Sequence, residues 1–373
     1  MRSILAVAAL AVVLAPSPAE AAAPPVQARA YIVQSSVDGR TLAARDADTP
    51  RAMASITKLM TALVAVQRLE LDRTVTVSPA ATRIGESTLS LRPGQRVTVR
   101  DLVIGTLVPS ANDAATALAI AAAGDLPRFV AAMNAEARRL GLTGTRYRNP
   151  HGLDQGGHVS TARDSAKLLR EALRVRVLRR YAGAAAARLS NGRWVRSTDN
   201  LVGTFGGFVA GKTGHTSLAG WSQVGFAKQG AVGITVTVLG AATEAQRDSE
   251  LTALLRFGLA SYRASRVVAP ARSYGLVSVG WGQPRVPVVA PRAIVRPTPA
   301  GRPLVEQIVI PAVLSLPVAA GQRVGTLVVR DGSRVIARSP LVAGESRAEP
   351  SRATKAAWLA RRTGHNLVDL VTP

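Results

Sequence analysis

Residues 55–58 read Ser-Ile-Thr-Lys, and this is the only Ser-x-x-Lys sequence in the chain. Three residues apart on a helix, a serine hydroxyl and a lysine amine project from one face within reach of each other. An amine that burial or neighbouring charge keeps neutral can take the serine proton and make the hydroxyl nucleophilic. Taken alone the pattern is weak, because short patterns arise by chance and a surface helix pair has the same sequence.

A second pattern, Ser110-Ala111-Asn112, lies where a turn leads into a predicted helix. A second hydroxyl can relay a proton, and an amide can both donate and accept hydrogen bonds towards a peptide substrate. A helix N-cap uses the same residue types, so this pattern by itself equally favours a structural interpretation.

A third pattern, Lys212-Thr213-Gly214-His215, follows a glycine-rich stretch. On a strand it would set a cation and a hydroxyl beside a substrate carboxylate. The glycine would let the substrate backbone approach closely and pair with the strand edge. By itself this pattern is also compatible with an edge-strand turn.

Lysine is scarce in this chain, whose formal net charge of +24 is carried mainly by arginine. A lysine can lose its proton near neutral pH when it is buried, whereas an arginine effectively cannot. The few lysines that remain therefore invite a chemical explanation. They are Lys58, Lys167, Lys212, Lys228 and Lys355.

The order of the three patterns decides the fold. Ser-x-x-Lys, Ser-x-Asn and Lys-Thr-Gly, in this order along the chain, are the elements of the penicillin-interactive serine fold. Two of the five lysines fall inside them. Each pattern also has the helix, loop or strand context that the fold requires.

The surrounding sequence, from about Tyr31 to Val342, resembles the D-alanyl-D-alanine carboxypeptidases, the low-molecular-mass penicillin-binding proteins. One departure is Met53-Ala54 before Ser55, where the family often has Pro-Ala; this loosens one backbone constraint and removes no chemical group. The resemblance is carried by Ser55-Ile-Thr-Lys-Leu-Met-Thr, Leu91-Arg-Pro-Gly, Leu107-Val-Pro-Ser-Ala-Asn-Asp-Ala, Asn149-Pro-His-Gly-Leu-Asp, His158-Val-Ser-Thr-Ala-Arg-Asp, Gly211-Lys-Thr-Gly-His-Thr and Ala320-Gly-Gln-Arg-Val-Gly-Thr-Leu.

The resemblance implies an active site of nine residues. It makes Ser55 the nucleophile and Lys58 its base, and it gives the backbone amides of Ser55 and His215 as the oxyanion hole. The catalytic residues that it implies are Ser55, Lys58, Ser110 and Asn112, and the substrate-binding residues are Lys212, Thr213, Gly214, His215 and Arg247. His151 and His158 are interpreted as structural, and a contact from the His215 ring to substrate stays open.

The activity that the resemblance implies is removal of the terminal D-alanine from peptidoglycan pentapeptides through an acyl-enzyme. The expected partners are a stem peptide that ends in D-Ala-D-Ala and β-lactam antibiotics, and no cofactor is expected. The chain has no cysteine, and its four histidines form no metal-ligand spacing, so neither a thiolate nucleophile nor a catalytic metal is favoured.

The N-terminus predicts export. Arg2 precedes the apolar run Ile4 to Leu14, and Ala19-Glu20-Ala21 offers small residues for cleavage, so residues 1–21 are interpreted as a signal peptide. The expected location is the periplasm or another extracytoplasmic space. Export, together with scattered rather than clustered charges, argues against nucleic acid as a partner.

The chain is predicted to be α+β: an antiparallel sheet flanked by helices, followed by a small all-β domain. The serine peptidase domain is placed at 24–265, the all-β domain at 266–345 and a basic tail at 346–373. The elements expected in the first domain are a hairpin around Asp38-Gly39, a buried helix from Ser55 to Leu69, strands at 74–77 and 97–99, helices at 111–123, 126–140 and 161–174, strands within 224–239 and a helix at 245–262.

The tail has the composition of an amphipathic helix that could lie on a membrane. In a helix, five residues would share one face, and Gly364 interrupts the pattern. A disordered tail is the alternative. The apolar face would consist of Ala356, Leu359, Thr363, Leu367 and Leu370, and Lys355, Arg361 and Arg362 could meet anionic lipid.

Three other functions of the same fold are weighed. A class A β-lactamase needs a glutamate on a loop between the Ser-x-Asn and Lys-Thr-Gly patterns. Here Glu86-Ser precedes Ser110, and only Glu136 and Glu171, both in predicted helices, lie between the patterns. A DD-endopeptidase acting on cross-links would use the same acyl-enzyme. A non-catalytic wall-binding protein is disfavoured by the intact site.

Overall fold

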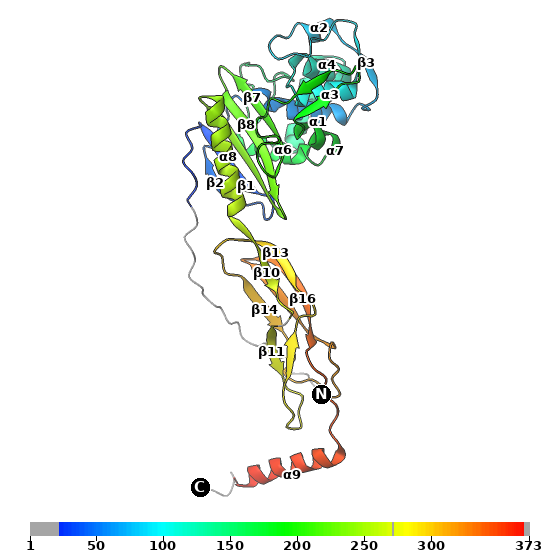
Figure 1. Ribbon diagram of the computed structural model, residues 1–373, viewed down its shortest axis with the longest axis vertical. Helices are drawn as coiled ribbons and strands as arrows, with labels where there is room; N and C mark the ends of the chain where they lie inside the picture. Colours follow the sequence, from blue (N-terminus) through cyan, green and yellow to red (C-terminus); the bar gives the residue numbers. More distant parts are fainter. Residues whose placement is uncertain (1–21, 271, 369–373) are drawn as a thin grey trace. The chain divides into compact units, whose positions relative to one another are not determined.

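The computed structural model describes residues 22–270 and 272–368, with side chains described as far as Arg361. The predicted signal peptide and Leu370 lie outside the described residues. Contacts divide the chain into two compact units, one that ends at Ser261 and one that begins at Tyr262 (Figure 1).

The first unit is built around a five-stranded antiparallel sheet with the strand order β2-β1-β9-β8-β7. Its first hairpin forms as predicted, with Gly39 at φ +77° in the turn, a conformation that glycine adopts without strain. The strands are β1 (Ala30–Ser35), β2 (Thr41–Arg45), β7 (Phe208–Thr216), β8 (Gly220–Gln229) and β9 (Val232–Ala241).

Helices cover the sheet. The strand β9 is buried along nearly its whole length, as expected for a strand covered on both faces. Helix α8 (Glu244–Ala260) packs so closely that a Cβ on Gly258 would stand 2.6 Å from Ile234. Helix α6 (Ala162–Ala172) packs against β9, β8 and β1. These contacts confirm the predicted sheet flanked by helices.

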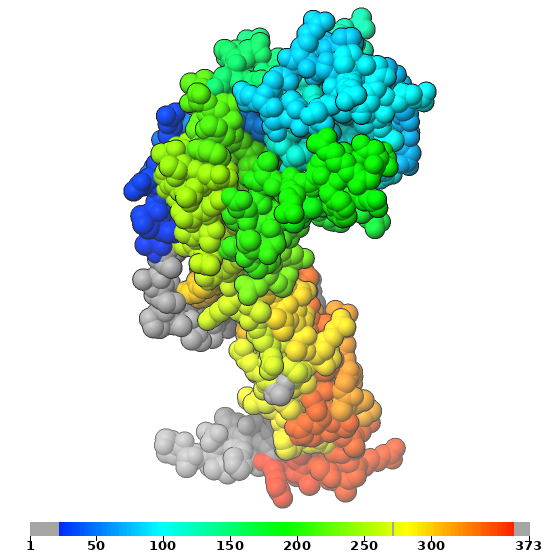
Figure 2. Space-filling model, turned by 45° about the horizontal axis from the view of Figure 1, so that its top comes forward, coloured from blue at the N-terminus to red at the C-terminus, as the bar shows by residue number. Residues whose placement is uncertain are grey.

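The rest of the first unit is a helical region around α1 (Figures 1 and 2). In Figure 2 the cyan residues of α2 to α4 gather in one part of the unit, and the yellow-green residues of β8 and α8 gather in another. The predicted helix at Ser55 starts as a 3₁₀ turn, η1 (Ala54–Thr57), and continues as α1 (Lys58–Val66). The other elements are α2 (Pro79–Thr82), α3 (Val99–Leu107), α4 (Asn112–Ala123), α5 (Leu126–Arg139), α7 (Arg176–Ala182) and the hairpins β3 (Thr74–Thr76)–β4 (Arg96–Thr98) and β5 (Ala186–Arg188)–β6 (Trp194–Arg196).

Helix α6 is capped by Thr161, but Thr161 and Asp164 form only half of a capping box. The Thr161 side chain accepts a hydrogen bond from the Asp164 backbone N–H at 3.0 Å. The Asp164 carboxylate does not return to the cap. It accepts instead from the Gly144 backbone N–H at 2.8 Å and the Thr145 hydroxyl at 2.7 Å, and so holds the preceding loop.

The second unit is all-β before its last helix, as predicted. Its core joins Val288, Leu327 and Leu341 from a five-stranded antiparallel sheet of order β11-β12-β16-β15-β14. The elements are β10 (Tyr262–Val268), β11 (Ser273–Val277), β12 (Val286–Val289), β13 (Ile294–Pro299), β14 (Val305–Val309), β15 (Arg323–Asp331), β16 (Arg334–Ala343) and α9 (Arg352–Val368).

Helix α9 lies in the tail, and Leu359 on the expected apolar face is exposed. Its Trp358 contacts Trp281 edge to face, with 5.5 Å between ring centroids. Within the described ranges, no single helix is long and apolar enough to cross a membrane, and α4 with α5 meets those limits only as a pair bent by 88°.

Candidate active site

Ser55 lies in the turn that opens α1. The preceding residue, Ala54, has φ +49°, a conformation that non-glycine residues rarely adopt. The Nζ of Lys58, the first residue of α1, lies 2.7 Å from the Ser55 Oγ. The structure therefore brings together the hydroxyl and the amine that the sequence pairs.

Lys58 is completely buried and has three oxygen neighbours. Besides Ser55, its Nζ lies 2.6 Å from Asn112 Oδ1 and 2.7 Å from the His151 carbonyl oxygen. Burial, and secondly the positive charge of Lys212, hold the pKa of Lys58 well below its usual range. A neutral amine keeps two N–H donors for Asn112 and His151, and its lone pair then faces the Ser55 hydroxyl proton.

Lys212 lies on β7 and is also buried. Its Nζ donates to Ser110 Oγ at 2.9 Å and to the Thr213 carbonyl oxygen at 3.0 Å. Burial lowers the pKa of Lys212 to about 7, and the nearby Asp199 carboxylate opposes this shift. Ser110, at φ +63°, thus connects Lys212 to the pocket that holds Ser55.

Strand β7 passes directly behind the backbone of Ser55. A Cβ on Gly214 would stand 2.8 Å from the Ser55 backbone nitrogen and 3.0 Å from the Met53 carbonyl oxygen. Only glycine allows this approach, which brings the His215 segment of the strand next to the Ser55 N–H. The His215 ring is exposed and stacks on Trp221, with 4.1 Å between centroids.

Arg247, on α8, contributes a buried guanidinium to the same pocket. Its Nη2 donates to Glu244 at 3.1 Å, and its Nε donates to Asp248 at 2.8 Å. Its guanidinium also lies over the Trp221 ring at 5.5 Å. These contacts fix the plane of the guanidinium, so that its free edge can meet an anion in the pocket.

The pocket has a volume of about 350 Å³. It brings together seven of the nine residues that the sequence singles out, and the other two, Lys58 and Lys212, lie buried behind Ser55 and Ser110. The seven are Ser55, Ser110, Asn112, Thr213, Gly214, His215 and Arg247.

Sequence reasoning missed a polar layer that supports Lys212 and Thr213. The Thr198 hydroxyl lies 2.7 Å from the Thr213 hydroxyl. Buried Asp199 accepts a hydrogen bond from Gln223 Nε2 at 2.7 Å, and burial raises its pKa to about 6. No sequence pattern identifies these residues, because Thr198 and Asp199 lie in the loop that follows β6 and reach the site only where this loop packs on β7 and β8.

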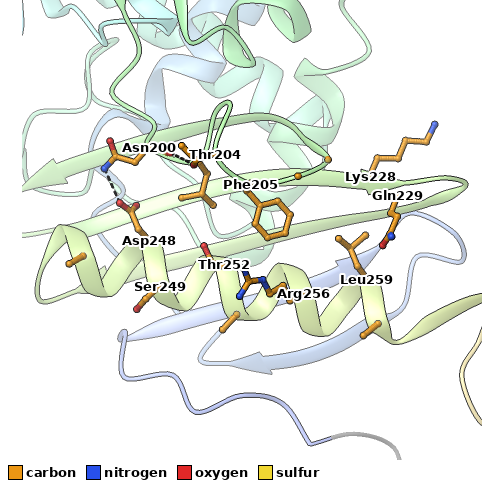
Figure 3. A pocket seen from close by; sticks show the side chains of 16 residues that line it. Asn200, Thr204, Phe205, Lys228, Gln229, Asp248, Ser249, Thr252, Arg256 and Leu259 are labelled. Atoms are coloured by element: carbon orange, nitrogen blue, oxygen red, sulfur yellow. Dashed lines mark hydrogen bonds between the residues drawn. The ribbon is translucent and has the colours of Figure 1, made fainter.

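A larger pocket of about 1050 Å³ lies along α8 and the segment 200–207 (Figure 3). Figure 3 shows Asn200 at one end, where its Nδ2 donates to Asp248 at 2.8 Å, and Arg256 further along the helix. None of the nine residues lines this pocket. Among the residues that the structure describes, no group of three or more metal-ligating side chains occurs.

The two histidines interpreted as structural are buried and hydrogen-bonded in the neutral form. The His158 Nδ1 accepts from the Arg148 backbone N–H at 2.9 Å, and its Nε2 lies 2.8 Å from the Thr57 hydroxyl. The His151 Nδ1 accepts from the Leu153 backbone N–H at 3.2 Å. Burial lowers the pKa to about 3 for His151 and about 4 for His158.

These shifts predict that acid destabilises the protein. The unfolded histidines titrate near pH 6.5, so between that pH and about 4 the unfolded chain binds more protons than the folded one. We expect the free energy of unfolding, measured by urea denaturation, to fall as pH is lowered from 7 to 5. Because the His215 ring is exposed, His215→Asn should keep this dependence. A free energy that stays constant over this range would contradict the prediction.

A family model described as D-alanyl-D-alanine carboxypeptidase matches residues 17–243. The chain is 34% identical over 347 residues to the D-alanyl-D-alanine carboxypeptidase DacC of Escherichia coli, covering 87% of this chain and 85% of that one. It is 29% identical to DacF of Bacillus subtilis, covering 86% and 85%.

Solved structures agree with the sequence comparisons. The carboxypeptidase DacD of Francisella tularensis aligns with a TM-score of 0.64 at 26% identity, covering 92% of this chain and 98% of that one. Penicillin binding protein 5 of Haemophilus influenzae aligns with a TM-score of 0.66 at 26% identity, covering 88% and 100%.

Proposed function

This chain belongs to the D-alanyl-D-alanine carboxypeptidase family of serine peptidases, and we propose that Ser55 carries its reaction through an acyl-enzyme. The substrate is a peptidoglycan stem peptide that ends in D-Ala-D-Ala, and the product is the peptide shortened by one D-alanine. The observation that supports the assignment best is the 2.7 Å contact of a fully buried lysine amine, on Lys58, with the Ser55 hydroxyl at the floor of a pocket.

Binding of the substrate depends on its terminal carboxylate. The Thr213 hydroxyl and Arg247 line the pocket, and Lys212 lies behind Ser110, to which its amine donates at 2.9 Å; together they supply the donors for this carboxylate. The peptide backbone pairs with the free edge of β7, whose Gly214 packs against the Ser55 backbone and so brings the bound peptide close to Ser55. This orientation directs the scissile carbonyl at Ser55.

Acylation starts when neutral Lys58 takes the Ser55 proton and the Oγ attacks the carbonyl carbon. The backbone N–H groups of Ser55 and His215 stabilise the oxyanion; removing one such donor typically costs about 10²–10³ in rate. The proton that Lys58 has taken passes through Ser110, which is hydrogen-bonded to Lys212, to the departing D-alanine amine, and Lys58 becomes neutral again. Water then hydrolyses the ester, and Lys58 again serves as the base.

β-Lactams acylate the same serine, because their strained amide takes the place of the D-Ala-D-Ala peptide bond. Deacylation in a class A β-lactamase needs a glutamate between the second and third patterns. The two glutamates in that interval are occupied elsewhere. Glu136, on α5, accepts from Arg139 and Gln67, and Glu171, on α6, pairs with Arg174.

The location of the enzyme is proposed from its family and its N-terminus. Its relatives are enzymes of the cell wall, and a signal peptide at residues 1–21 would export this chain to the same compartment. The exposed Leu359, with Lys355 and Arg361 on α9, favours association with an anionic membrane surface. Deletion of residues 347–373 should move the enzyme from the membrane fraction to the soluble fraction, and an unchanged distribution would contradict the anchor.

The proposed reaction is tested by D-alanine release from a pentapeptide that ends in D-Ala-D-Ala. We expect one D-alanine per peptide, together with slow turnover of nitrocefin. Rapid nitrocefin hydrolysis without D-alanine release would favour a β-lactamase. Preferential cleavage of cross-linked dimers would favour an endopeptidase, and binding without any release would favour a non-catalytic wall protein.

A further inference from the structure

The loop of residues 85–87 is hydrogen-bonded to Asn112 on two sides. The Asn112 side-chain Nδ2 donates to the Gly85 carbonyl oxygen at 3.0 Å. The Asn112 backbone N–H donates to the Ser87 carbonyl oxygen at 2.6 Å. The Ser87 hydroxyl in turn donates to the Pro109 carbonyl oxygen at 2.9 Å. The residues on both sides of Glu86 are therefore hydrogen-bonded to the segment that contains Ser110 and Asn112.

Glu86 lies between Gly85 and Ser87 in this loop and has a strained backbone conformation. Its φ is +64°, in the left-handed region that a glutamate rarely adopts. Such strain persists only where surrounding contacts impose it, and it concentrates at ligand-binding sites. Here the hydrogen bonds of Gly85 and Ser87 to Asn112 impose it, and Glu86 lines the pocket that contains Ser55 and Ser110.

The carboxylate of Glu86 has no partner of its own among the residues that the structure describes: it makes neither a hydrogen bond nor an ion pair with them. The other acidic residue that lines the pocket, Glu244, already accepts from Arg247 and Asn200 at 3.1 Å each. The negative charge of Glu86 nevertheless acts on Lys58: burial holds the pKa of Lys58 well below its usual range, and Glu86 partly opposes this shift. Glu86 is thus an exposed acceptor at the edge of a reactive pocket.

Charge determines which part of a substrate can face Glu86. The terminal carboxylate of the peptide would be repelled by a second carboxylate, and it goes to the cations Lys212 and Arg247. The Asn112 side of the pocket is then left for the acyl part of the substrate. This part contains the first D-alanine and the residue that precedes D-Ala-D-Ala. A protonated amine on that residue would form a charge-assisted hydrogen bond with Glu86.

We propose that Glu86 is a specificity residue, which binds a protonated side-chain amine on the residue preceding D-Ala-D-Ala. This inference rests on the proposed function and deepens it. It also assigns a role to Glu86, which precedes Ser110 in the chain and so does not correspond to the deacylating glutamate of a β-lactamase. The ion pair at this exposed site is screened by salt, so its effect is strongest at low ionic strength.

The test uses the full mature chain and two peptides, acetyl-Lys-D-Ala-D-Ala with a free ε-amine and the same peptide with the ε-amine acetylated. The ratio of their kcat/KM values is measured for the wild type, Glu86→Gln, Glu86→Asp and a control, Glu70→Gln, which alters an exposed glutamate that does not line the pocket. We expect the wild type to prefer the free amine by about five- to tenfold.

Glu86→Gln should bring this ratio close to one, whereas Glu86→Asp should keep part of the preference and Glu70→Gln all of it. Added salt should lower the wild-type ratio. Equal rates for both peptides in the wild type, or an unchanged ratio in Glu86→Gln, would overturn this inference alone. A wild-type enzyme that released D-alanine from neither peptide would overturn the proposed function, and this inference with it.

Discussion

Ser55→Ala is expected to lower kcat for D-alanine release by about 10³-fold or more. Without the hydroxyl no acyl-enzyme can form, and the residual rate depends on the oxyanion donors and on binding alone. The substitution removes one atom from a half-buried side chain, so the thermal unfolding midpoint should stay within a few degrees of the wild type.

The matched control for this variant is Ser249→Ala, which alters an exposed serine on α8 outside the active-site pocket. It should keep the full rate. Noncovalent binding of the donor peptide should persist in Ser55→Ala, because Lys212 and Arg247 are intact. Full D-alanine release by Ser55→Ala would contradict the assignment of the nucleophile.

Lys58→Arg is expected to lower kcat by about 10²–10⁴-fold although the positive charge is kept. A guanidinium cannot lose its proton near neutral pH and has no lone pair for the Ser55 proton. The arginine is also longer than the space between Asn112 and His151, where Nζ lies within 2.7 Å of its oxygen neighbours. Steady-state kinetics, with the unfolding midpoint as a check on folding, provide the measurement.

Lys228→Arg is the control for this second substitution, because Lys228 is exposed and lies outside the pocket. It should retain wild-type rates. Lys58→Met offers an independent variant that places no charge in the buried site, and its loss should be similar. Near-normal kcat in either Lys58 variant would show that another group accepts the Ser55 proton.

Several features follow directly from the sequence. The three short patterns predict the site because each gives its residues a fixed local geometry: Ser55 and Lys58 on successive turns of one helix, and Lys212 and Thr213 on one strand. The Asp38-Gly39 turn likewise predicts the first hairpin, and the β-branched residues of β9 predict a strand. Local patterns of this kind need no knowledge of distant contacts.

Other features depend on contacts between segments that are distant in sequence. The hydrogen bonds of residues 85–87 to Asn112 join a loop to a helix start, and Asp199 comes near Lys212 only because the loop after β6 packs on β7 and β8. The left-handed backbone of Ala54 and Ser110 is imposed by this packing, because neither residue type favours it. For the same reason the carboxylate of Asp164 turns to Gly144 instead of completing its capping box.

The central claim is that Ser55, activated by Lys58, forms the acyl-enzyme. It is tested most directly by incubating the enzyme with benzylpenicillin, digesting it and locating the adduct by mass spectrometry. We predict a single penicilloyl group on the peptide that contains Ser55, and none in Ser55→Ala. An adduct on any other residue, or an undiminished adduct in Ser55→Ala, would contradict the account.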